Sequence, residues 1–282
     1  MKIVVIGSNG FLGNAASEIL SQNNEVIEAG ITSENKLDAT KINEVRNFLL
    51  KHKPDVVLDA VALTSSTKCE DDPELAERLN YLTAKNISEV CREIGSWMIF
   101  ISSSYLFDGK KGNYNENDKT SEINQYARTK IMAEREVLKN PKSIILRVDV
   151  MYGYNGKNKK NGVFDNILSG KEISVRDPHQ LRQPIFVDDV PRIMVELMSK
   201  KQKGIFHLAG PERMEMLFFL KNLESIFRKD SFIRVIKDDS QKNKIKIPSN
   251  ATFDTSKIRG LGINFTSFED GLNIIGRRLN VG

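Results

Sequence analysis

The sequence predicts an α/β protein with a doubly wound, mainly parallel sheet. Through the first 150 residues, short β-rich runs alternate with longer helical stretches, which is the pattern of parallel strands joined by crossover helices. The runs are mostly apolar, as in strands that helices cover on both faces. A glycine-rich turn joins the first run to the first helical stretch. These three observations carry the fold assignment.

The elements follow in order along the chain. Strands are expected at residues 2–6, 25–29, 55–59, 97–102 and 143–148, and helices at about 11–22, 41–51, 73–94 and 123–139. The third helix would bury Leu75, Leu79, Leu82 and Val90. Beyond Val150 we expect a short helix near 163–169, an apolar run at 184–187 that leads into a helix, and a buried strand at 204–208.

The chain is expected to form two parts. Residues 1–149 would form a Rossmann domain, whose sheet is completed by about 184–210. Residues 150–183 and 211–282 would form a smaller lobe over the carboxyl edge of the sheet, where doubly wound folds bind their ligands.

Composition and charge favour a soluble protein that binds small molecules. The 282 residues carry a net charge of +5, with 37 acidic residues dispersed among 42 basic ones, and a mean hydropathy of -0.36. The basic clusters at 157–160 and 242–246 contain no aromatic residue, so they predict solvated loops or the steering of a phosphorylated substrate. We expect neither a nucleic acid nor a membrane as partner.

The sequence also argues against export. The apolar run at 3–6 is shorter than the core of a signal peptide and ends in glycine. Cys69 and Cys91 occur without secretory context and are expected to be free thiols in the reducing cytoplasm.

The glycine turn predicts dinucleotide binding. Gly7, Gly10 and Gly13 form a G-x-x-G-x-x-G turn between a strand and a helix. The first two glycines allow a tight turn close to a pyrophosphate, and the third allows close packing of helix on strand. The helix dipole would then hold the phosphates. Asn9, Phe11 and Leu12 belong to the same turn.

The end of the second strand bears on the choice of cofactor. An acidic residue there would bind a ribose 2′-hydroxyl and exclude a 2′-phosphate. The chain has Ala29 and Gly30 at this point, although Glu28 is only one register step away. The sequence therefore favours NADPH, with NADH as an alternative.

Two Tyr-x-x-x-Lys pairs suit proton transfer, because this spacing places both side chains on one helix face, where the ammonium can stabilise a phenolate. Tyr81 and Lys85 fall opposite the apolar stripe of their helix, which indicates a surface pair. Tyr126 and Lys130 fall on the inward stripe and are the expected catalytic pair. Ser103, at the end of an apolar strand, could donate to a substrate carbonyl beside Tyr126.

With these residues in place, the chain resembles the extended short-chain reductases, and within them the dTDP-4-dehydrorhamnose reductase group together with the related regulatory subunit of methionine adenosyltransferase. The matching segments run nearly from end to end: the glycine turn and residues 37–40, 54–62, 102–109, 126–130, 146–153, 186–189, 207–210 and 254–257.

The resemblance implies roles for individual residues. Ser103 matches the catalytic Ser/Thr, Tyr126 the proton donor, and Lys130 the residue that binds the nicotinamide ribose. Ser104 and Tyr105 match positions near the sugar. The positions implied at the cofactor are Asp38 and Ala39 at the adenine, and Ala60, Ala62 and Thr64 after the strand at 55–59.

Three departures concern the substrate and the assembly. The group usually has Ser-Thr-Asp-Tyr where this chain has Ser102-Ser103-Ser104-Tyr105, so a carboxylate is lost beside the catalytic hydroxyl. The group's tryptophan after the strand at 143–148 is here Val150, so a substrate-site position loses a stacking surface. The glutamate that links metal-bridged dimers is missing after Gly13. We therefore expect no bound metal, and a monomer or homodimer.

Other chemistry has weak support in the sequence. His52, His179 and His207 lack metal-ligand spacing, and His207 lies on an apolar run that favours a structural histidine. Asp188 and Asp189 are expected to cap a helix rather than to act as an acid–base pair.

Three functions are therefore open. The first is reduction of the 4-keto group of a nucleotide-linked deoxysugar, dTDP-4-dehydrorhamnose above all. The second is a reductase or epimerase acting on another nucleotide sugar, which Ser104 and Val150 motivate. The third is an NADP-binding regulatory subunit without catalysis.

Overall fold

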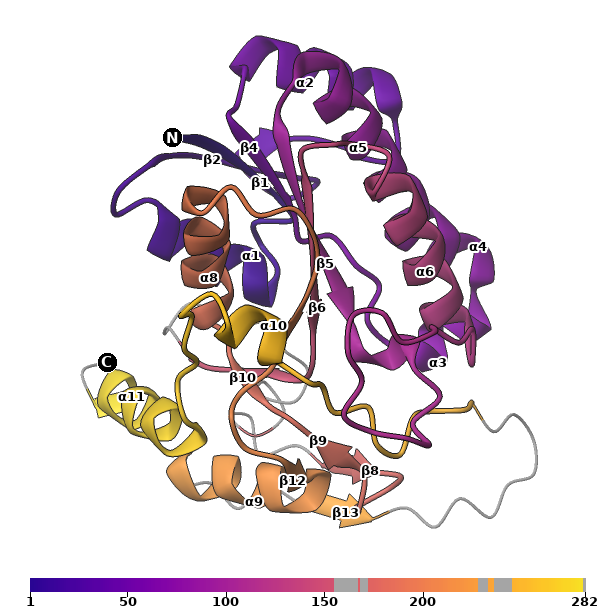
Figure 1. Ribbon diagram of the computed structural model, residues 1–282, viewed down its shortest axis with the longest axis vertical. Helices are drawn as coiled ribbons and strands as arrows, with labels where there is room; N and C mark the ends of the chain where they lie inside the picture. The colour runs from indigo at the N-terminus through magenta and orange to yellow at the C-terminus, as the bar shows by residue number, and fades with distance from the viewer. Residues whose placement is uncertain (155–166, 168–171, 228–232, 236–244, 281–282) are drawn as a thin grey trace.

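The computed structural model describes residues 1–154, 167, 172–227, 233–235 and 245–280. Its centre is a seven-stranded parallel sheet in the order β11-β6-β5-β4-β1-β2-β3 (Figure 1). The strands are β1 (Lys2–Ile6), β2 (Glu25–Gly30), β3 (Asn35–Lys36), β4 (Val56–Asp59), β5 (Trp97–Ser103), β6 (Ser143–Val148) and β11 (Gly204–Leu208). The expected α/β doubly wound fold is confirmed, and β11 pairs with β6 as the last strand of the sheet.

Helices cover both faces of this sheet (Figure 1). One face packs on α1 (Phe11–Leu20) and α8 (Asp189–Ser199), and the other on α2 (Ile42–His52), α5 (Thr83–Ile94) and α6 (Gln125–Val137). Alternate residues of each strand serve the two faces, since successive side chains point in opposite directions. In β1, for example, Ile3 and Val5 belong to the first core and Val4 and Ile6 to the second.

The region between β4 and α5 is not one regular helix. It contains α3 (Ser66–Asp71), α4 (Pro73–Ala76) and a π-helix at Glu77–Leu82, which continues into α5. The wider π turn changes which side chains face inward. Leu75, Leu79 and Leu82 are only half-buried, whereas Ala76 and Asn80 are buried. The expected inward stripe is therefore wrong before residue 83 and correct at Val90.

A second group of elements lies below the sheet in Figure 1 and packs around Tyr152 in a separate apolar cluster. The elements after β6 that complete the chain are β7 (Met151–Tyr152), β8 (Ile173–Val175), β9 (Leu181–Arg182), β10 (Ile185–Phe186), β12 (Met214–Glu215), α9 (Met216–Phe227), β13 (Ile233–Val235), α10 (Ser256–Arg259) and α11 (Phe268–Asn280).

Three expected segments fall wholly or mostly on parts of the chain that the structure does not describe. The helix expected near 163–169 lies almost entirely outside the described residues, as do the basic cluster at 157–160 and most of the cluster at 242–246.

Within the described part of the chain, no helix combines the length and apolar character needed to cross a membrane. Cys69 and Cys91 are buried free thiols.

Candidate active site

The glycine turn after β1 brings the start of α1 close to the backbone at the end of β1. Gly7 has a φ of 86°, a conformation that favours glycine. A Cβ on Gly13 would lie 2.2 Å from the Gly7 carbonyl oxygen, so a side chain there would push α1 away from β1. α1 begins without a side-chain cap and without an acidic residue in its first turn. The helix terminus therefore carries no carboxylate that would repel a pyrophosphate.

Hydroxyl groups follow β2 beside this turn. The hydroxyl oxygens of Ser8 and Ser33 are 2.7 Å apart, and Asn9 Nδ2 donates to Thr32 Oγ1 at 2.7 Å. Ala29 is the register partner of Ile6, the last residue of β1. The exposed Glu28 precedes that position by one residue. The chain from Ala29 to Ser33 thus brings no carboxylate to the turn.

The remaining positions expected at the cofactor differ in their surroundings. Asp38 accepts hydrogen bonds from the hydroxyl and the amide of Thr40 at 2.7 and 3.1 Å, and the hydroxyl bond is the main cause of its lowered pKa. Ala39 is buried. Ala60 lies against the glycine turn, since a Cβ on Gly7 would come within 3.0 Å of its carbonyl carbon. Ala62 and Thr64 are exposed on the loop after β4. Their contact with a cofactor stays a prediction.

β5 and α6 bring two hydroxyl side chains together. Ser103 ends β5, and its Oγ accepts a hydrogen bond from the Tyr105 amide at 3.1 Å. Tyr126 lies in the first turn of α6, which Asn124 caps by accepting from the Ala127 amide at 2.8 Å. Burial raises the pKa of Tyr126 to about 12, and the neighbouring Ser103 hydroxyl acts in the opposite direction. Tyr126 therefore holds its proton in this structure, and giving the proton up would require the phenolate to be stabilised.

Lys130 lies one turn after Tyr126 and is 1% exposed. Its Nζ donates to the Ile101 carbonyl at 2.6 Å and lies 4.0 Å from the centroid of the Phe100 ring. Burial lowers the pKa of Lys130 to about 8, against the opposing effect of Asp59. The ammonium is therefore held against β5.

Asp59 at the end of β4 is a buried carboxylate. Its Oδ1 accepts from the Val61 amide at 3.0 Å, whereas its Oδ2 has no hydrogen-bond partner. Burial raises the pKa of Asp59 to about 6, and Lys130 acts to lower it. Asp59 is the register partner of Phe100, so it shares the sheet face on which the Lys130 ammonium lies.

A carboxylate from another part of the chain lies against Ser104, the position where the resembling group usually has aspartate. Ser104 donates to Asp149 Oδ1 at 2.6 Å, and the Gln183 amide donates to Asp149 Oδ2 at 2.6 Å. Asp149 also forms an ion pair with Arg182 of β9. Position 104 itself therefore carries no carboxylate, as the sequence shows, but Asp149, directly after β6, brings one to the Ser104 hydroxyl.

The other positions expected near a sugar are less enclosed. Tyr105 is half-buried, and its ring meets that of Tyr126 edge to face, with centroids 6.3 Å apart. Gln180 approaches the Tyr105 hydroxyl at 3.4 Å. Val150 is half-buried against the cluster around Tyr152. Ser103, Ser104 and Tyr105 are thus brought together, and Val150 packs on the adjoining apolar core.

Asn80, in the π-helix, links the loop after β4 to α6. Its Oδ1 accepts from the Leu63 amide at 2.7 Å, and its Nδ2 donates to the Leu63 carbonyl and to Thr129 Oγ1, both at 3.2 Å. Thr129 in turn donates to the Tyr126 carbonyl at 3.0 Å. The π-helix therefore helps to fix the turn of α6 that carries Tyr126.

His207, Asp188 and Asp189 lie outside this site and contact residues that have structural roles. His207 bonds through Nδ1 to the Tyr114 carbonyl at 2.9 Å, and burial lowers its pKa to about 3. Asp188 stands at the N-cap of α8 but makes no capping hydrogen bond, so that part of the expectation is wrong. It pairs instead with Arg278, and Asp189 pairs with Arg192. Among the described residues no group of histidine, cysteine or carboxylate side chains is arranged to hold a metal ion.

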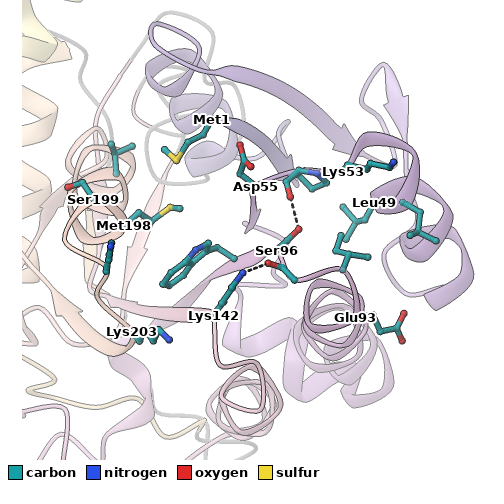
Figure 2. A pocket seen from close by; sticks show the side chains of 17 residues that line it. Met1, Leu49, Lys53, Asp55, Glu93, Ser96, Lys142, Met198, Ser199 and Lys203 are labelled. Atoms are coloured by element: carbon teal, nitrogen blue, oxygen red, sulfur yellow. Dashed lines mark hydrogen bonds between the residues drawn. The ribbon is translucent and has the colours of Figure 1, made fainter.

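A cavity of about 1150 Å³ opens at the opposite edge of the sheet. Figure 2 shows its labelled lining, which includes Met1, Asp55, Ser96, Lys142 and Lys203. Each of these residues precedes a strand of the central sheet. The cavity therefore lies at the amino ends of the strands, away from Ser103 and Tyr126.

Sequence reasoning missed three residues that the site contains: Asn80, Asp149 and Arg182. None belongs to a pattern with a known chemical spacing, and the contacts of each join segments far apart in the chain. The buried polar character of the segment around Arg182 is visible only once β9 is placed beside Tyr105.

Comparisons with known proteins agree with this fold. A family model described as RmlD substrate binding domain matches residues 1–280. Methionine adenosyltransferase 2 subunit beta of Pongo abelii is 30% identical over 280 residues, covering 93% of this chain and 83% of that protein.

Two solved structures have closely similar folds. A dTDP-4-dehydrorhamnose reductase of Clostridium acetobutylicum superposes with a TM-score of 0.85 at 25% identity, covering 100% of this chain and 99% of that one. A dTDP-4-dehydrorhamnose reductase of Bacillus anthracis, solved with NADP, gives 0.86 at 24% identity, covering 97% and 98%. By its sequence match over nearly the whole length, this chain belongs to the RmlD substrate-binding-domain family.

Proposed function

We propose that this protein reduces the 4-keto group of a nucleotide-linked deoxysugar, in the first place dTDP-4-dehydrorhamnose, at the expense of NADPH. One observation carries the proposal: the Ser103 and Tyr126 hydroxyls meet at the carboxyl edge of the sheet, the same edge on which the glycine turn opens. A dinucleotide held at the turn would extend along this edge toward the two hydroxyls.

The residues of the chain divide the chemistry between them. A bound nicotinamide would supply hydride to the carbonyl carbon. Tyr126 gives its proton to the oxygen as the C–O double bond becomes a single bond, so that the product is a neutral alcohol. Ser103 donates a hydrogen bond that holds the same oxygen. Tyr126 enters the reaction protonated, and the Ser103 hydroxyl, which acts to lower its pKa, favours release of the proton.

The surroundings of β2 support NADPH as the cofactor. A 2′-phosphate there would meet the hydroxyls of Thr32 and Ser33, and Lys36 is the register partner of Gly30 on the neighbouring strand. Hydroxyls and an ammonium bind a phosphate, whereas a carboxylate would repel it. The Bacillus anthracis relative was solved with NADP. NADH stays the alternative, since the 2′-hydroxyl of its ribose can use the same hydroxyl groups.

We also assign the two parts of the chain to the two ligands. Residues 1–149, with the sheet completed by about 184–210, would bind the dinucleotide. The smaller lobe, residues 150–183 and 211–282, would bind the sugar nucleotide. The contact of Arg182 with Asp149 and of Gln180 with Tyr105 supports this division, since both bring the lobe to the catalytic hydroxyls.

Turnover of labelled cofactor tests the proposal. The purified chain is given NADPH carrying deuterium at one or the other C4 position, with dTDP-4-dehydrorhamnose or other keto sugar nucleotides. We expect one deuterium at the reduced sugar carbon from only one of the two labelled forms, and a lower KM for NADPH than for NADH. Turnover of a different sugar nucleotide alone would move the assignment to the second function named from the sequence. Absence of any turnover, with the cofactor bound, would contradict the proposal.

A second candidate function follows from the relative with 30% identity, which is named as a subunit of methionine adenosyltransferase. In that case the chain would bind NADP and act on a partner enzyme without catalysis. Stable co-purification with an enzyme whose kinetics it changes, together with no reduction of keto sugars, would establish this function. Robust turnover by the isolated chain would count against it.

A further inference from the structure

The cavity at the amino ends of the strands takes no part in the proposed chemistry. It measures about 1150 Å³ and lies at the edge of the sheet opposite Ser103 and Tyr126. Its lining includes the apolar side chains of Leu49, Trp97 and Met198. Sites for small molecules usually measure about 300–1,000 Å³, so this cavity has room for a whole ligand.

Hydrogen bonds of the sheet hold the walls of the cavity in place. The Trp97 amide donates to the Asp55 carbonyl at 2.9 Å, and the Ser96 hydroxyl donates to the Pro54 carbonyl at 2.6 Å. These bonds join the starts of β4 and β5. The cavity therefore exists before a ligand enters it, and binding does not have to order its walls.

Four lysines line the same cavity: Lys53, Lys142, Lys201 and Lys203. All four are exposed, and among the described residues none of them forms an ion pair with a carboxylate. Lys142 Nζ donates to the Gly95 carbonyl at 2.7 Å. In Figure 2, Lys53 and Lys203 lie on opposite sides of the cavity. Positive charge thus surrounds an apolar floor.

The negative charge at the cavity is smaller. Glu93 is neutralised by Arg46, which donates to it at 2.9 and 3.0 Å, and Asp55 accepts from the Lys2 amide at 2.8 Å. The helices α2, α5 and α8 end at this edge, and the C-terminus of a helix carries about half a negative charge. Four ammonium groups exceed the sum of these charges, so the cavity attracts anions.

Two of the lysines have a backbone conformation that a lysine rarely adopts. Three described residues other than glycine have a positive φ, and two of them line this cavity: Lys53 at 48° and Lys201 at 54°. Lys53 ends α2, and Lys201 follows α8. Glycine or asparagine adopts this conformation more easily at the end of a helix. Lysine at both positions adds charge to the rim at the cost of a less favourable backbone.

We propose that this cavity is a second ligand site and that it binds a nucleoside diphosphate. The base lies against the Trp97 ring and the apolar side chains beside it, because bases stack on aromatic rings. The diphosphate meets Lys142 and Lys203, whose ammonium groups form charge-assisted hydrogen bonds with phosphate oxygens. The site goes beyond the proposed reduction and does not depend on it.

Lys203 connects the two halves of the site. Its Nζ lies 5.9 Å from the centre of the Trp97 ring, within the range of a cation–π contact. An ammonium at this distance reaches the phosphates of a nucleotide whose base rests on the same ring. A diphosphate suits the cavity better than a single carboxylate does, because several lysines share the rim.

Tryptophan fluorescence tests the proposal directly, because Trp97 is the only tryptophan of the chain. The purified full chain is titrated with ADP, and we expect saturable quenching with a Kd below about 1 mM. Adenosine, which lacks the phosphates, should bind about tenfold more weakly or worse. Gly13→Ala, a change in the glycine turn at the opposite edge, should leave the ADP titration unchanged.

Charge reversal tests the role of the lysines. Lys142→Glu/Lys203→Glu should raise the Kd for ADP by about tenfold or more. The matched control is Lys119→Glu/Lys221→Glu, which changes the net charge equally at two exposed lysines outside the cavity and should leave the Kd nearly unchanged. Acetylation of the unaltered chain, read by mass spectrometry, guards against a folding defect: ADP should slow the modification of Lys142 and Lys203 but not of Lys119.

Four results would overturn the proposal. They are quenching that does not saturate, equal affinity for adenosine and ADP, equal losses in the two double variants, and acetylation of Lys142 and Lys203 that ADP does not slow. Loss of the quenching in Gly13→Ala would place ADP at the glycine turn and would also contradict a second site. None of these measurements needs turnover, so failure of the reductase assignment leaves their outcome unaffected.

Discussion

The glycine turn and the tyrosine site lie at the same edge of the sheet but are built in different ways. The turn is made of backbone: Gly7, Gly10 and Gly13 lie within seven consecutive residues, and their close neighbours are backbone atoms of the turn itself and of the ends of β2 and β4. The tyrosine site is made of side chains from β5, α6, β6 and β9, held by a buried ion pair between Asp149 and Arg182. The first feature follows from local sequence, and the second depends on long-range packing.

The difference has an energetic meaning. A backbone contact is disturbed by any side chain that enters it, so the turn should respond to steric changes. A buried ion pair is disturbed most when one partner is removed, because the remaining charge is left without water or a counterion. Each region therefore has its own most damaging substitution.

The largest loss of stability is expected from Asp149→Asn. The change leaves the Arg182 guanidinium buried without its anion, which costs about 3–5 kcal/mol of unfolding free energy. Urea denaturation of the purified chain measures it. The matched control is Glu122→Gln, the same chemical change in an exposed pair with Arg135, for which we expect about 1 kcal/mol or less. Equal losses in the two variants would show that the buried pair does not hold the tyrosine site together.

A smaller loss of stability, with a specific loss of cofactor binding, is expected from Gly13→Ala. The added methyl group would lie 2.2 Å from the Gly7 carbonyl oxygen and 2.8 Å from Ser8 Cα, so α1 must shift, at a cost of about 1–3 kcal/mol. Fluorescence titration with NADPH measures the accompanying loss of affinity.

The control for this change is Gly276→Ala in α11, where nothing lies within 4 Å of the added methyl group. It should bind NADPH as wild type does and gain about 0.5–1 kcal/mol of stability, because alanine favours a helix over glycine. If Gly13→Ala also binds NADPH with unchanged affinity, the turn is not the pyrophosphate site.

The strands of the sheet were predictable because a strand that is buried on both faces is apolar at nearly every position of its sequence. β1 at Lys2–Ile6 and β6 at Ser143–Val148 match the expected ranges, and β5 extends one residue further, to Ser103. The prediction of one regular third helix is wrong for a physical reason. A π-helix at Glu77–Leu82 interrupts the α-helical periodicity, and no residue type predicts such a turn.

The residues of the candidate site also fall into two groups, those that local sequence predicts and those that only the fold reveals. Ser103, Tyr126 and Lys130 could be found because strand ends and a four-residue spacing are local signals. Asp149 and Arg182 could not, since their pairing joins β6 to β9 and becomes visible only with the fold. Position 104 illustrates the limit: the sequence showed a serine where a carboxylate was expected, and the structure places the Asp149 carboxylate against that serine.

The central claim is that Tyr126 donates the proton in a reduction at this edge of the sheet. Substitution of Tyr126 by Phe, assayed for NADPH-dependent reduction of the keto sugar together with NADPH affinity, tests it most directly. The predicted result is a fall in kcat/KM of about 10²–10⁴-fold, the usual contribution of a general acid, with the Kd for NADPH nearly unchanged. A variant that turns over at the wild-type rate would contradict the claim.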